Sequence, residues 1–209
     1  MEGPWDVHRI LGTVPVLEDG SASFKVPSNT PIAVQPLDAE GKALQTMRSW
    51  FTAMPGETLS CVGCHESQNT GPPVRRTLAL EQEPVDIAQW YGPARGFSFK
   101  REVQPVLDKY CVGCHNPQRE GLPDFTAKDK QGWSNFTPSY LALHPYVRPP
   151  GPEIDYHLPN PMEFHADTSI LVQMLQKGHK GVQLDEEAWD RLITWIDLNV
   201  PDHGTWGEH

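Results

Sequence analysis

The pentapeptide CVGCH occurs twice in the chain, at residues 61–65 and 111–115, and the two copies contain all four cysteines. For a chain with this content of cysteine and histidine, the number of Cys-x-x-Cys-His pentads expected by chance is roughly 0.003. The repeat constrains the fold more than any other feature, because each copy brings two thiols and one imidazole to one place.

Three kinds of site compete for these residues. A structural zinc site also uses Cys-x-x-Cys pairs, but the usual separation of the pairs is about 15–20 residues, and Cys64 and Cys111 lie much further apart. A disulfide framework or a thioredoxin-like redox pair needs no His after the second Cys. Covalent haem attachment uses every residue type of the pentad, because each thiol forms a thioether with a vinyl group and the His binds the iron. The pattern therefore predicts two haem c groups, one held by Cys61, Cys64 and His65 and the other by Cys111, Cys114 and His115.

Composition limits the classes of protein and partner. A length of 209 residues allows one sizeable domain or two small ones, and 21 prolines with 17 glycines predict a loop-rich globular protein. The net charge is −10 and no run of Lys or Arg occurs, which argues against nucleic acid or an anionic membrane as a partner and favours a redox partner with a basic surface. No apolar stretch approaches the ~20 residues of a membrane span, and the N-terminus lacks signal-peptide features. We expect a soluble chain, either processed or cut from a longer protein, and its oligomeric state stays open.

The second pentad has helical surroundings. The segment FSFKREVQPVLDKY carries one apolar stripe that leads into the cysteines, and Pro105 is tolerable there if it lies in the first turn. The stripe consists of Phe99, Val103, Val106, Leu107 and Tyr110. This helix is predicted to deliver the pentad at its C-terminal end.

Two more helices are predicted near the C-terminus. One spans ADTSILVQMLQKG, with Asp167 or Thr168 as N-cap and Gly178 as the stop. The other spans LDEEAWDRLITWIDLNVP, where acidic residues fill the first turn and Pro201 lies beyond the end. Its apolar face is formed by Trp189, Leu192, Ile193 and Ile196 and is interpreted as core.

The N-terminal half carries strand signals. Ala22, Phe24 and Val26 alternate with polar neighbours, Ile32 and Val34 continue the period, and LDAEGKAL has the composition of a turn. Residues 116–166 show little periodicity and many prolines, which predicts a long loop that either wraps a haem or runs over the surface. The chain is therefore predicted to have a mixed fold, mainly α-helical with long loops and with a small N-terminal β unit.

The motifs resemble known families. The segment FKREVQPVLDKYCVGCH, the following helix and the terminal Trp-Ile helix resemble the planctomycete-type cytochrome c domain over roughly residues 97–200. The wider order of segments resembles the two-haem C-terminal part of hydrazine synthase alpha subunits. It runs from the strand region through RSWFTAMPGETLSCVGCH to a second haem segment that ends in WIDLNVPDHGTW. The resemblance implies a β-rich segment 1–96 with the first haem site and a cytochrome c-like domain 97–209 with the second.

The resemblance also implies axial ligands. A Met after the Ser-x-Leu helix usually supplies the sixth ligand in the planctomycete-type domain, and the matching place here is His179 in KGHKG. The second haem is thereby expected to be bis-His, with His115 and His179 on its iron. In hydrazine synthase alpha subunits, a tyrosine four residues after the motif His takes part in binding the iron, whereas this chain has Asn69 there.

Other side chains stay open as sixth ligands. His165 and His203 are the alternatives to His179 at the second haem. For the first haem the candidates are His8, His144, His157, Met47 and Met54, and an open or water-bound iron is a further alternative. His209 is expected to be exposed.

The leading functional interpretation is a dihaem c-type cytochrome that transfers single electrons. The alternative is a haem enzyme or gas-binding protein with an open first haem that acts on a small nitrogen or peroxide species. The chain could also be the electron-entry module of a larger protein, and whether it is an enzyme stays open. The resemblance implies a periplasmic or other extracytoplasmic compartment, because haem c is normally installed outside the cytoplasm.

Overall fold

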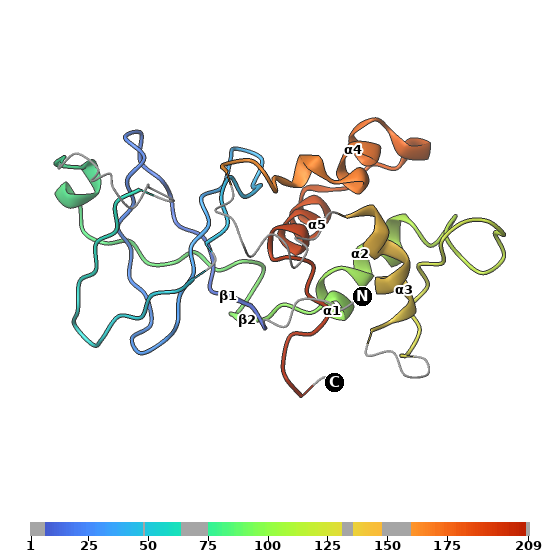
Figure 1. The fold of residues 1–209 in the computed structure, drawn as a ribbon, viewed down its shortest axis with the longest axis horizontal. Coiled ribbons are helices and arrows are strands. Elements are labelled where there is room, and N and C mark those ends of the chain that lie inside the picture. The colour runs from blue at the N-terminus through green and yellow to red at the C-terminus, as the bar shows by residue number, and fades with distance from the viewer. Residues whose placement is uncertain (1–6, 48, 64–74, 131–135, 148–159, 208–209) are drawn as a thin grey trace. The chain divides into compact units, whose positions relative to one another are not determined.

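The computed structural model describes residues 7–47, 49–63, 75–130, 136–147 and 160–207. The chain forms two compact units (Figure 1). Unit 1 comprises Met1–Arg9, Pro36–Thr46 and Gly96–His209, and unit 2 comprises Ile10–Gln35 and Met47–Arg95. The predicted assignment of one haem site to residues 1–96 and the other to 97–209 stays a prediction.

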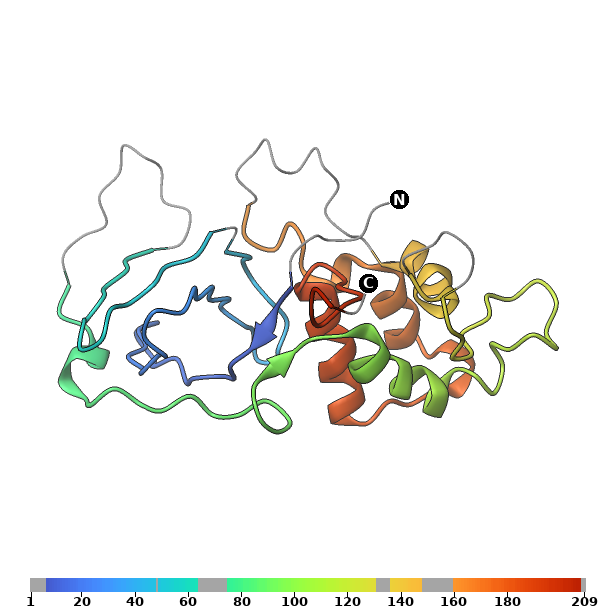
Figure 2. The same cartoon turned by 90° about the horizontal axis from the view of Figure 1, so that it is seen from below.

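Unit 2 consists mainly of extended but irregular chain (Figure 2). The one helical turn among its described residues is η1 (Leu78–Glu81). The predicted strand periodicity appears as isolated bridges, which pair Thr13 with Ala88, Phe24 with Val85 and Ile32 with Phe51. The two named strands, β1 (Arg9–Ile10) and β2 (Arg95–Gly96), pair where the chain passes from one unit to the other.

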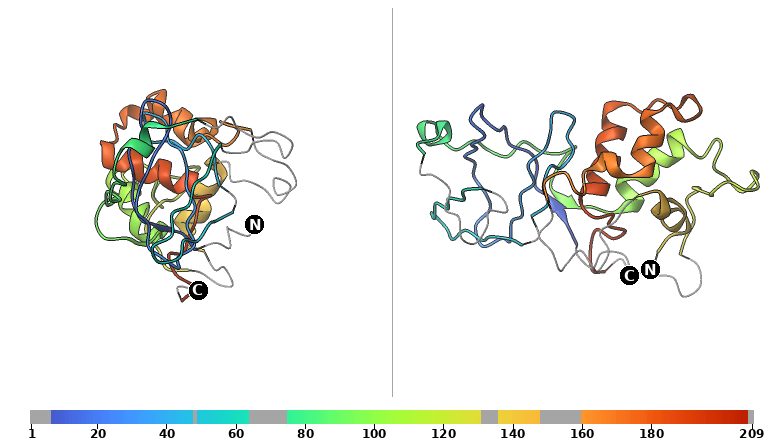
Figure 3. Two further views of the ribbon diagram at one scale, coloured as in Figure 1. Left: turned by 90° about the vertical axis from the view of Figure 1, so that its left-hand side faces the viewer. Right: turned by 45° about the horizontal axis from the view of Figure 1, so that its top comes forward.

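Unit 1 contains all the α-helices of the described residues (Figure 3). They are α1 (Phe99–Glu102), α2 (Gln104–Tyr110), α3 (Pro138–Leu143), α4 (Ile170–Gln176) and α5 (Glu186–Asp197). Short 3-10 turns η2 (His144–Tyr146), η4 (Ala166–Thr168) and η5 (His179–Gly181) extend or connect them. The predicted overall class, mainly α-helical with long loops and a small β unit, stays a prediction.

Aromatic side chains of three helices form the centre of unit 1. Phe99, Tyr140 and Trp195 are at most 1% exposed, and the Phe99 ring lies 5.3 Å from the rings of both other residues. Tyr140 donates its hydroxyl to the Val200 carbonyl, and Trp195 donates its indole N–H to the Pro201 carbonyl. Buried aromatic residues with a polar tip need such partners, so this cluster fixes the chain after α5 as well as the three helices.

The predicted helix before the second pentad is broken in two. Val103 has φ −103° and separates α1 from α2, and Pro105 lies in the first turn of α2. Proline has no N–H to donate to the carbonyl four residues earlier, so a first-turn position suits it. The predicted first-turn position of Pro105 is confirmed, and the predicted stripe from Phe99 to Tyr110 is divided between α1 and α2. The delivery of the pentad is confirmed, since α2 ends at Tyr110 and Cys111 is its C-cap.

The second predicted helix begins later than expected. Ser169 is the N-cap of α4, and its hydroxyl accepts the N–H of Val172. Asp167 and Thr168 lie in η4 instead, so both predicted N-caps were wrong, because a 3-10 turn occupies those positions. The predicted stop is confirmed, since Gly178 follows the helix with φ +87°.

The third predicted helix is confirmed as α5. Asp185 caps it by accepting the N–H of Ala188 at 2.8 Å, and Glu186 and Glu187 occupy its first turn, where the helix dipole favours acids. None of the helices in the described segments is long and apolar enough to cross a membrane, as predicted.

The predicted turn at LDAEGKAL is confirmed as a hairpin within unit 1. Leu37 and Ala43 form an antiparallel bridge, and Asp38 accepts the N–H groups of Glu40 and Lys42 at the turn. We call residues 36–46 the clip hairpin. Polar groups of this hairpin form hydrogen bonds with α5, with η4 and with the segment before η4.

Candidate cofactor site

The first pentad is only partly described. Cys61 is an exposed, free thiol in unit 2, on a segment without regular structure. Cys64, His65 and Asn69 lie outside the described residues. The expected role of this pentad therefore rests on its sequence.

The second pentad forms a tight turn at the end of α2. The N–H of Cys111 donates to the Leu107 carbonyl at 2.8 Å, which continues the helical pattern. The N–H groups of Cys114 and His115 both donate to the Cys111 carbonyl, at 3.0 and 2.9 Å. The turn gathers two thiols and one imidazole within five residues, and both cysteines are free thiols.

Burial argues against a redox-active dithiol at this turn. It raises the pKa of the Cys111 thiol to about 11, whereas a reactive Cys-x-x-Cys pair needs a lowered pKa to supply thiolate at neutral pH.

The His115 ring is held on one nitrogen and on one face. Its Nδ1 lies 3.1 Å from the Pro123 carbonyl oxygen, which can only accept, so Nδ1 carries the hydrogen and donates it. The ring of Phe125 stacks on the imidazole, with centroids 4.6 Å apart and planes at 24°. In the neutral imidazole Nε2 is thereby left to bind a metal, which is how a carbonyl partner usually prepares a histidine ligand.

His179 lies opposite His115 in unit 1. Gly178 ends α4 with a left-handed conformation, and His179 begins η5 directly after it. The two imidazole centroids are 6.0 Å apart, and the planes are inclined by 33°. A metal–imidazole nitrogen distance of about 2 Å on both sides of one ion would place two centroids about 6 Å apart. The two histidines and the two thiols therefore fit a covalently attached haem with two imidazole ligands.

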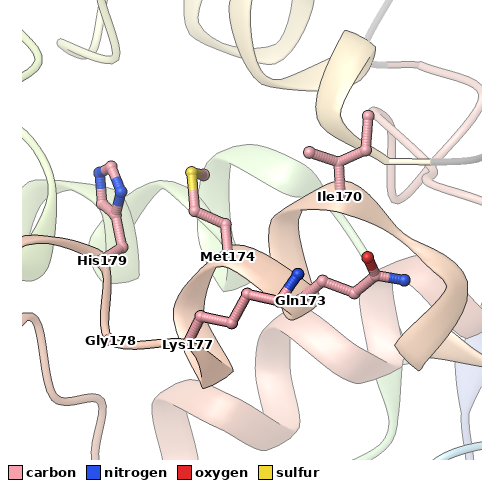
Figure 4. Close-up of a pocket in the computed structure, with 6 residues that line it drawn as sticks. All are labelled: Ile170, Gln173, Met174, Lys177, Gly178 and His179. Atoms are coloured by element: carbon pink, nitrogen blue, oxygen red, sulfur yellow. The ribbon is translucent and has the colours of Figure 1, made fainter.

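An open pocket of about 350 Å³ lies beside His179. Its lining residues are Ile170, Gln173, Met174, Lys177, Gly178 and His179 (Figure 4). The side chains of Ile170, Met174 and His179 extend to the same side of the chain (Figure 4). Ile170 is 59% exposed.

The alternative histidines for the second haem are engaged elsewhere. His165 is 5% exposed, its Nε2 lies 2.9 Å from the Asp38 carboxylate, and its Nδ1 accepts the N–H of Asp167 at 3.3 Å. The ring of His203 stacks on Phe136 with centroids 6.0 Å apart, and its Nδ1 lies 3.2 Å from the carboxylate of the adjacent Asp202. His165 has both nitrogens in protein contacts, which favours His179 over it as a ligand.

The candidates for the sixth ligand of the first haem are scattered. His144 is 4% exposed in unit 1, packs on Tyr140 and has a pKa lowered by burial. The carbonyl of His8 accepts the N–H of Phe97. Met54 is 60% exposed and Met47 is half-buried, both in unit 2, and His157 lies outside the described residues. No choice among them follows from these positions.

Sequence reasoning missed three residues that contact the site or its supports. Pro123 and Phe125 lie in the loop after the pentad, Gln104 lies at the start of α2, and only their contacts identify them. No periodicity or motif marks the two loop residues, because the path of a loop leaves no regular pattern in the sequence.

Comparisons with known proteins relate the chain to hydrazine synthase. Residues 1–66 match the family model of the hydrazine synthase alpha subunit middle domain. The hydrazine synthase subunit alpha of Kuenenia stuttgartiensis is 23% identical over 267 aligned positions, which cover 91% of this chain and 32% of that protein. The solved structure of Kuenenia stuttgartiensis hydrazine synthase matches with a TM-score of 0.60 and 19% identity, over 84% of this chain and 31% of the other.

These findings confirm the predicted similarity to hydrazine synthase alpha subunits. The chain spans about a third of the length of the relatives that it matches. At this level of identity, the solved structure supports a similarity of fold alone.

Proposed function

We propose that the chain is a two-haem c-type cytochrome segment that transfers single electrons, with a bis-His second haem. The observation that carries the proposal is the approach of the His115 and His179 rings to 6.0 Å beside two free thiols. Every donor type that this attachment requires is present at the second site. The duplicated pentad extends the proposal to the first site.

Each residue of the second site has a separate part. Cys111 and Cys114 would form the two thioether bonds, and His115 would bind the iron through Nε2. Pro123 keeps the hydrogen on Nδ1 and so makes the imidazole a stronger donor. His179 would bind the iron as a second imidazole ligand and so keep water and small molecules from it. When bound, the haem supplies an iron that gains and loses one electron at a potential set by these ligands.

The context of this activity follows from the sequence expectations. We infer a periplasmic or other extracytoplasmic location, because covalent haem c is installed there, and a cytochrome c-like arrangement of the helices around the second site. The excess of acidic residues, with a net charge of −10, supports a redox partner with a basic surface.

The second candidate function is an enzyme or gas-binding protein whose first haem is open. The observation that favours it is the family-model match over residues 1–66, which includes the whole first pentad. In that case the second haem would serve the first with electrons, and the substrate would be a small nitrogen or peroxide species. Asn69 stands where the resemblance implies a tyrosine near the iron, which argues against hydrazine formation itself.

Carbon monoxide distinguishes the two functions. The absorption spectrum of the dithionite-reduced protein is recorded with and without carbon monoxide, which binds open ferrous haem and competes poorly with two strong axial ligands. An unchanged spectrum supports two closed haems and electron transfer. A shift of about half the absorbance supports an open first haem, and a shift of all of it contradicts the bis-His second site.

A further inference from the structure

Gln104 is a buried polar residue that the proposed electron transfer does not yet explain. It lies at the start of α2 and is 5% exposed. Its amide nitrogen donates to the Phe125 carbonyl at 2.9 Å and to the Asp108 carboxylate at 2.8 Å. Its amide oxygen accepts the hydroxyl of Ser139, which is 1% exposed on α3, at 2.6 Å. One side chain thus joins α2, α3 and the loop that follows the second pentad.

Phe125 connects Gln104 to His115. Its backbone N–H donates to the His115 carbonyl at 3.1 Å, its ring stacks on the imidazole, and its carbonyl is held by Gln104. Pro123, which accepts the Nδ1 hydrogen, lies two residues earlier on the same strand of loop. The position of Phe125 therefore sets both the face and the hydrogen-bond partner of the imidazole, and Gln104 holds that position through the Phe125 carbonyl.

We infer that Gln104 is a positioning residue for the haem ligand His115, acting through the Phe125 carbonyl. The inference rests on the proposed function, in which His115 binds the iron. A glutamine is suited to this task because its planar amide offers two donors and an acceptor in fixed directions, and burial makes the loss of any partner costly. A movement of the loop, or a rotation of Phe125 within it, would then break a buried hydrogen bond.

The test replaces the amide by an apolar side chain of similar size. In Gln104→Leu, the Phe125 carbonyl loses its buried donor, so the loop from Pro123 to Phe125 can move. We expect a shifted low-spin electron paramagnetic resonance signal for the second haem, because its g values depend on the orientation of the ligand planes. We also expect a higher reduction potential for that haem, because a weakened bond from Nδ1 to Pro123 makes the imidazole a poorer donor to ferric iron. The second haem's signal is identified as the one lost in His179→Ala.

Three further variants separate positioning from general stability. Gln118→Leu changes an exposed glutamine of the same loop and should alter neither the signal nor the potential. Tyr140→Phe removes a buried hydrogen bond of the same unit outside this network and should lower stability alone. If Gln104→Leu does not fold, Ser139→Ala removes only the donor to the Gln104 amide oxygen and should shift the signal in the same direction, by less.

The outcomes distinguish the two levels of the proposal. Unchanged g values and potential in a fully loaded Gln104→Leu, or in Ser139→Ala where the first does not fold, would overturn the positioning role and leave the proposed function intact. The positioning role would also fall if Tyr140→Phe shifted them equally. If the wild-type protein has no low-spin signal that depends on His179, the proposed bis-His site fails before Gln104 is considered.

Discussion

The imidazole rings of His115 and His179 lie with their centroids 6.0 Å apart, although the two residues come from segments far apart in the sequence. His115 ends the turn after α2 and His179 begins η5 after α4. Each imidazole has its own support, since His115 is held by Pro123 and Phe125 and His179 follows the left-handed Gly178. Two imidazoles bound to a single metal ion would have a separation of about this size, which is the basis of the proposed bis-His site.

Removal of the His179 imidazole should open the second haem. In His179→Ala we expect half of the haem to become high-spin or water-ligated, and added imidazole to restore the low-spin spectrum by entering the vacated position. Absorption and electron paramagnetic resonance spectra of the ferric protein measure both effects. An unchanged low-spin spectrum would exclude His179 as a ligand.

Met174 provides the matched control for this variant. Its side chain lies in the same pocket as His179 (Figure 4), and a thioether is also an axial ligand in c-type cytochromes. Met174→Leu keeps the volume and should leave the spectrum of the otherwise unchanged protein as it is. A spin-state change in Met174→Leu would instead identify Met174 as the ligand.

The number of bound haems should follow the number of intact pentads. Replacement of Cys111 and Cys114 by Ser should reduce the covalent haem content from two to one per chain, and so should replacement of Cys61 and Cys64. A pyridine haemochrome assay on denatured protein, together with its intact mass, counts the bound groups. One haem in the unaltered protein would mean that one pentad has another role, and the doubly substituted variants would show which.

The sequence predicted the parts of the site that depend on local rules. The apolar stripe ending at Tyr110 delivers Cys111 at a helix terminus, and Gly178 stops α4 just before His179. Both features depend on neighbouring residues only, because helix ends are set by capping and by backbone conformations that few residues adopt. The same rules did not predict the break at Val103, and they placed the N-cap of α4 before Ser169. At each place two short elements, α1 with α2 and η4 with α4, stand where one longer helix was expected.

The parts that depend on tertiary contacts could not be predicted. Trp195 is fully buried in the aromatic cluster, although the predicted apolar face of α5 contained Trp189 instead. Helix α3 was missed because it lies in the proline-rich segment, where Pro138 occupies a position in the first turn that tolerates proline. The hold of Phe125 on His115 depends on the path of a loop, and a loop path leaves no periodic pattern.

The stability of the clip hairpin should depend on the carboxylate of Asp38. The carboxylate accepts two N–H groups of the turn, from Glu40 at 3.0 Å and Lys42 at 2.9 Å, and lies 2.9 Å from Nε2 of the buried His165. Asp38→Ala leaves three donors without this acceptor and should lower the free energy of unfolding by about 1–3 kcal/mol. Chemical denaturation of the haem-loaded protein measures the change. Glu40→Ala, on the exposed side of the same turn, should stay within about 0.5 kcal/mol, and an equal effect of the two variants would contradict the role of Asp38.

Asp197 should make stability depend on pH where the hairpin meets α5. Burial is the main cause that raises the pKa of this carboxyl to about 7, and the nearby Asp38 and Asp190 raise it further. The Ala43 N–H, which the carboxylate accepts at 2.8 Å, and the nearby His165 act in the other direction and lower the pKa. Lys42 and Asp167, whose ion pair measures 3.1 Å, are the other charged groups of this cluster. The folded protein binds the proton more tightly than the unfolded chain, whose carboxyl has the ordinary pKa of 3.8. This contribution to stability is therefore full at low pH and is lost as pH rises to about 7, at no more than ~1.4 kcal/mol per pH unit.

Asp197→Asn isolates that contribution. The amide oxygen can still accept the Ala43 N–H, but the group no longer titrates, so the variant should gain stability relative to the unaltered protein between pH 5 and pH 8. The difference between the two unfolding free energies at each pH removes the effect of groups that titrate in both, including His144, whose lowered pKa acts in the opposite direction. A difference that does not vary with pH would rule out a titrating Asp197.

The ion pair between Glu102 and Arg191 offers the sharpest test of packing between α1 and α5. Glu102 is 1% exposed and accepts hydrogen bonds from Arg191 and, at 2.9 Å, from Arg101. Removal of one member of a buried pair leaves a buried charge poorly compensated, so Arg191→Met should lower the free energy of unfolding by about 3–5 kcal/mol. Glu187→Gln, which changes only the exposed partner of Arg191, should cost less than about 1 kcal/mol.

The double variant Glu102→Leu with Arg191→Met removes both charges and should regain much of the lost stability, because apolar side chains of similar volume can replace a buried pair. If the double variant is as unstable as Arg191→Met, lost packing rather than the poorly compensated charge of Glu102 accounts for the effect.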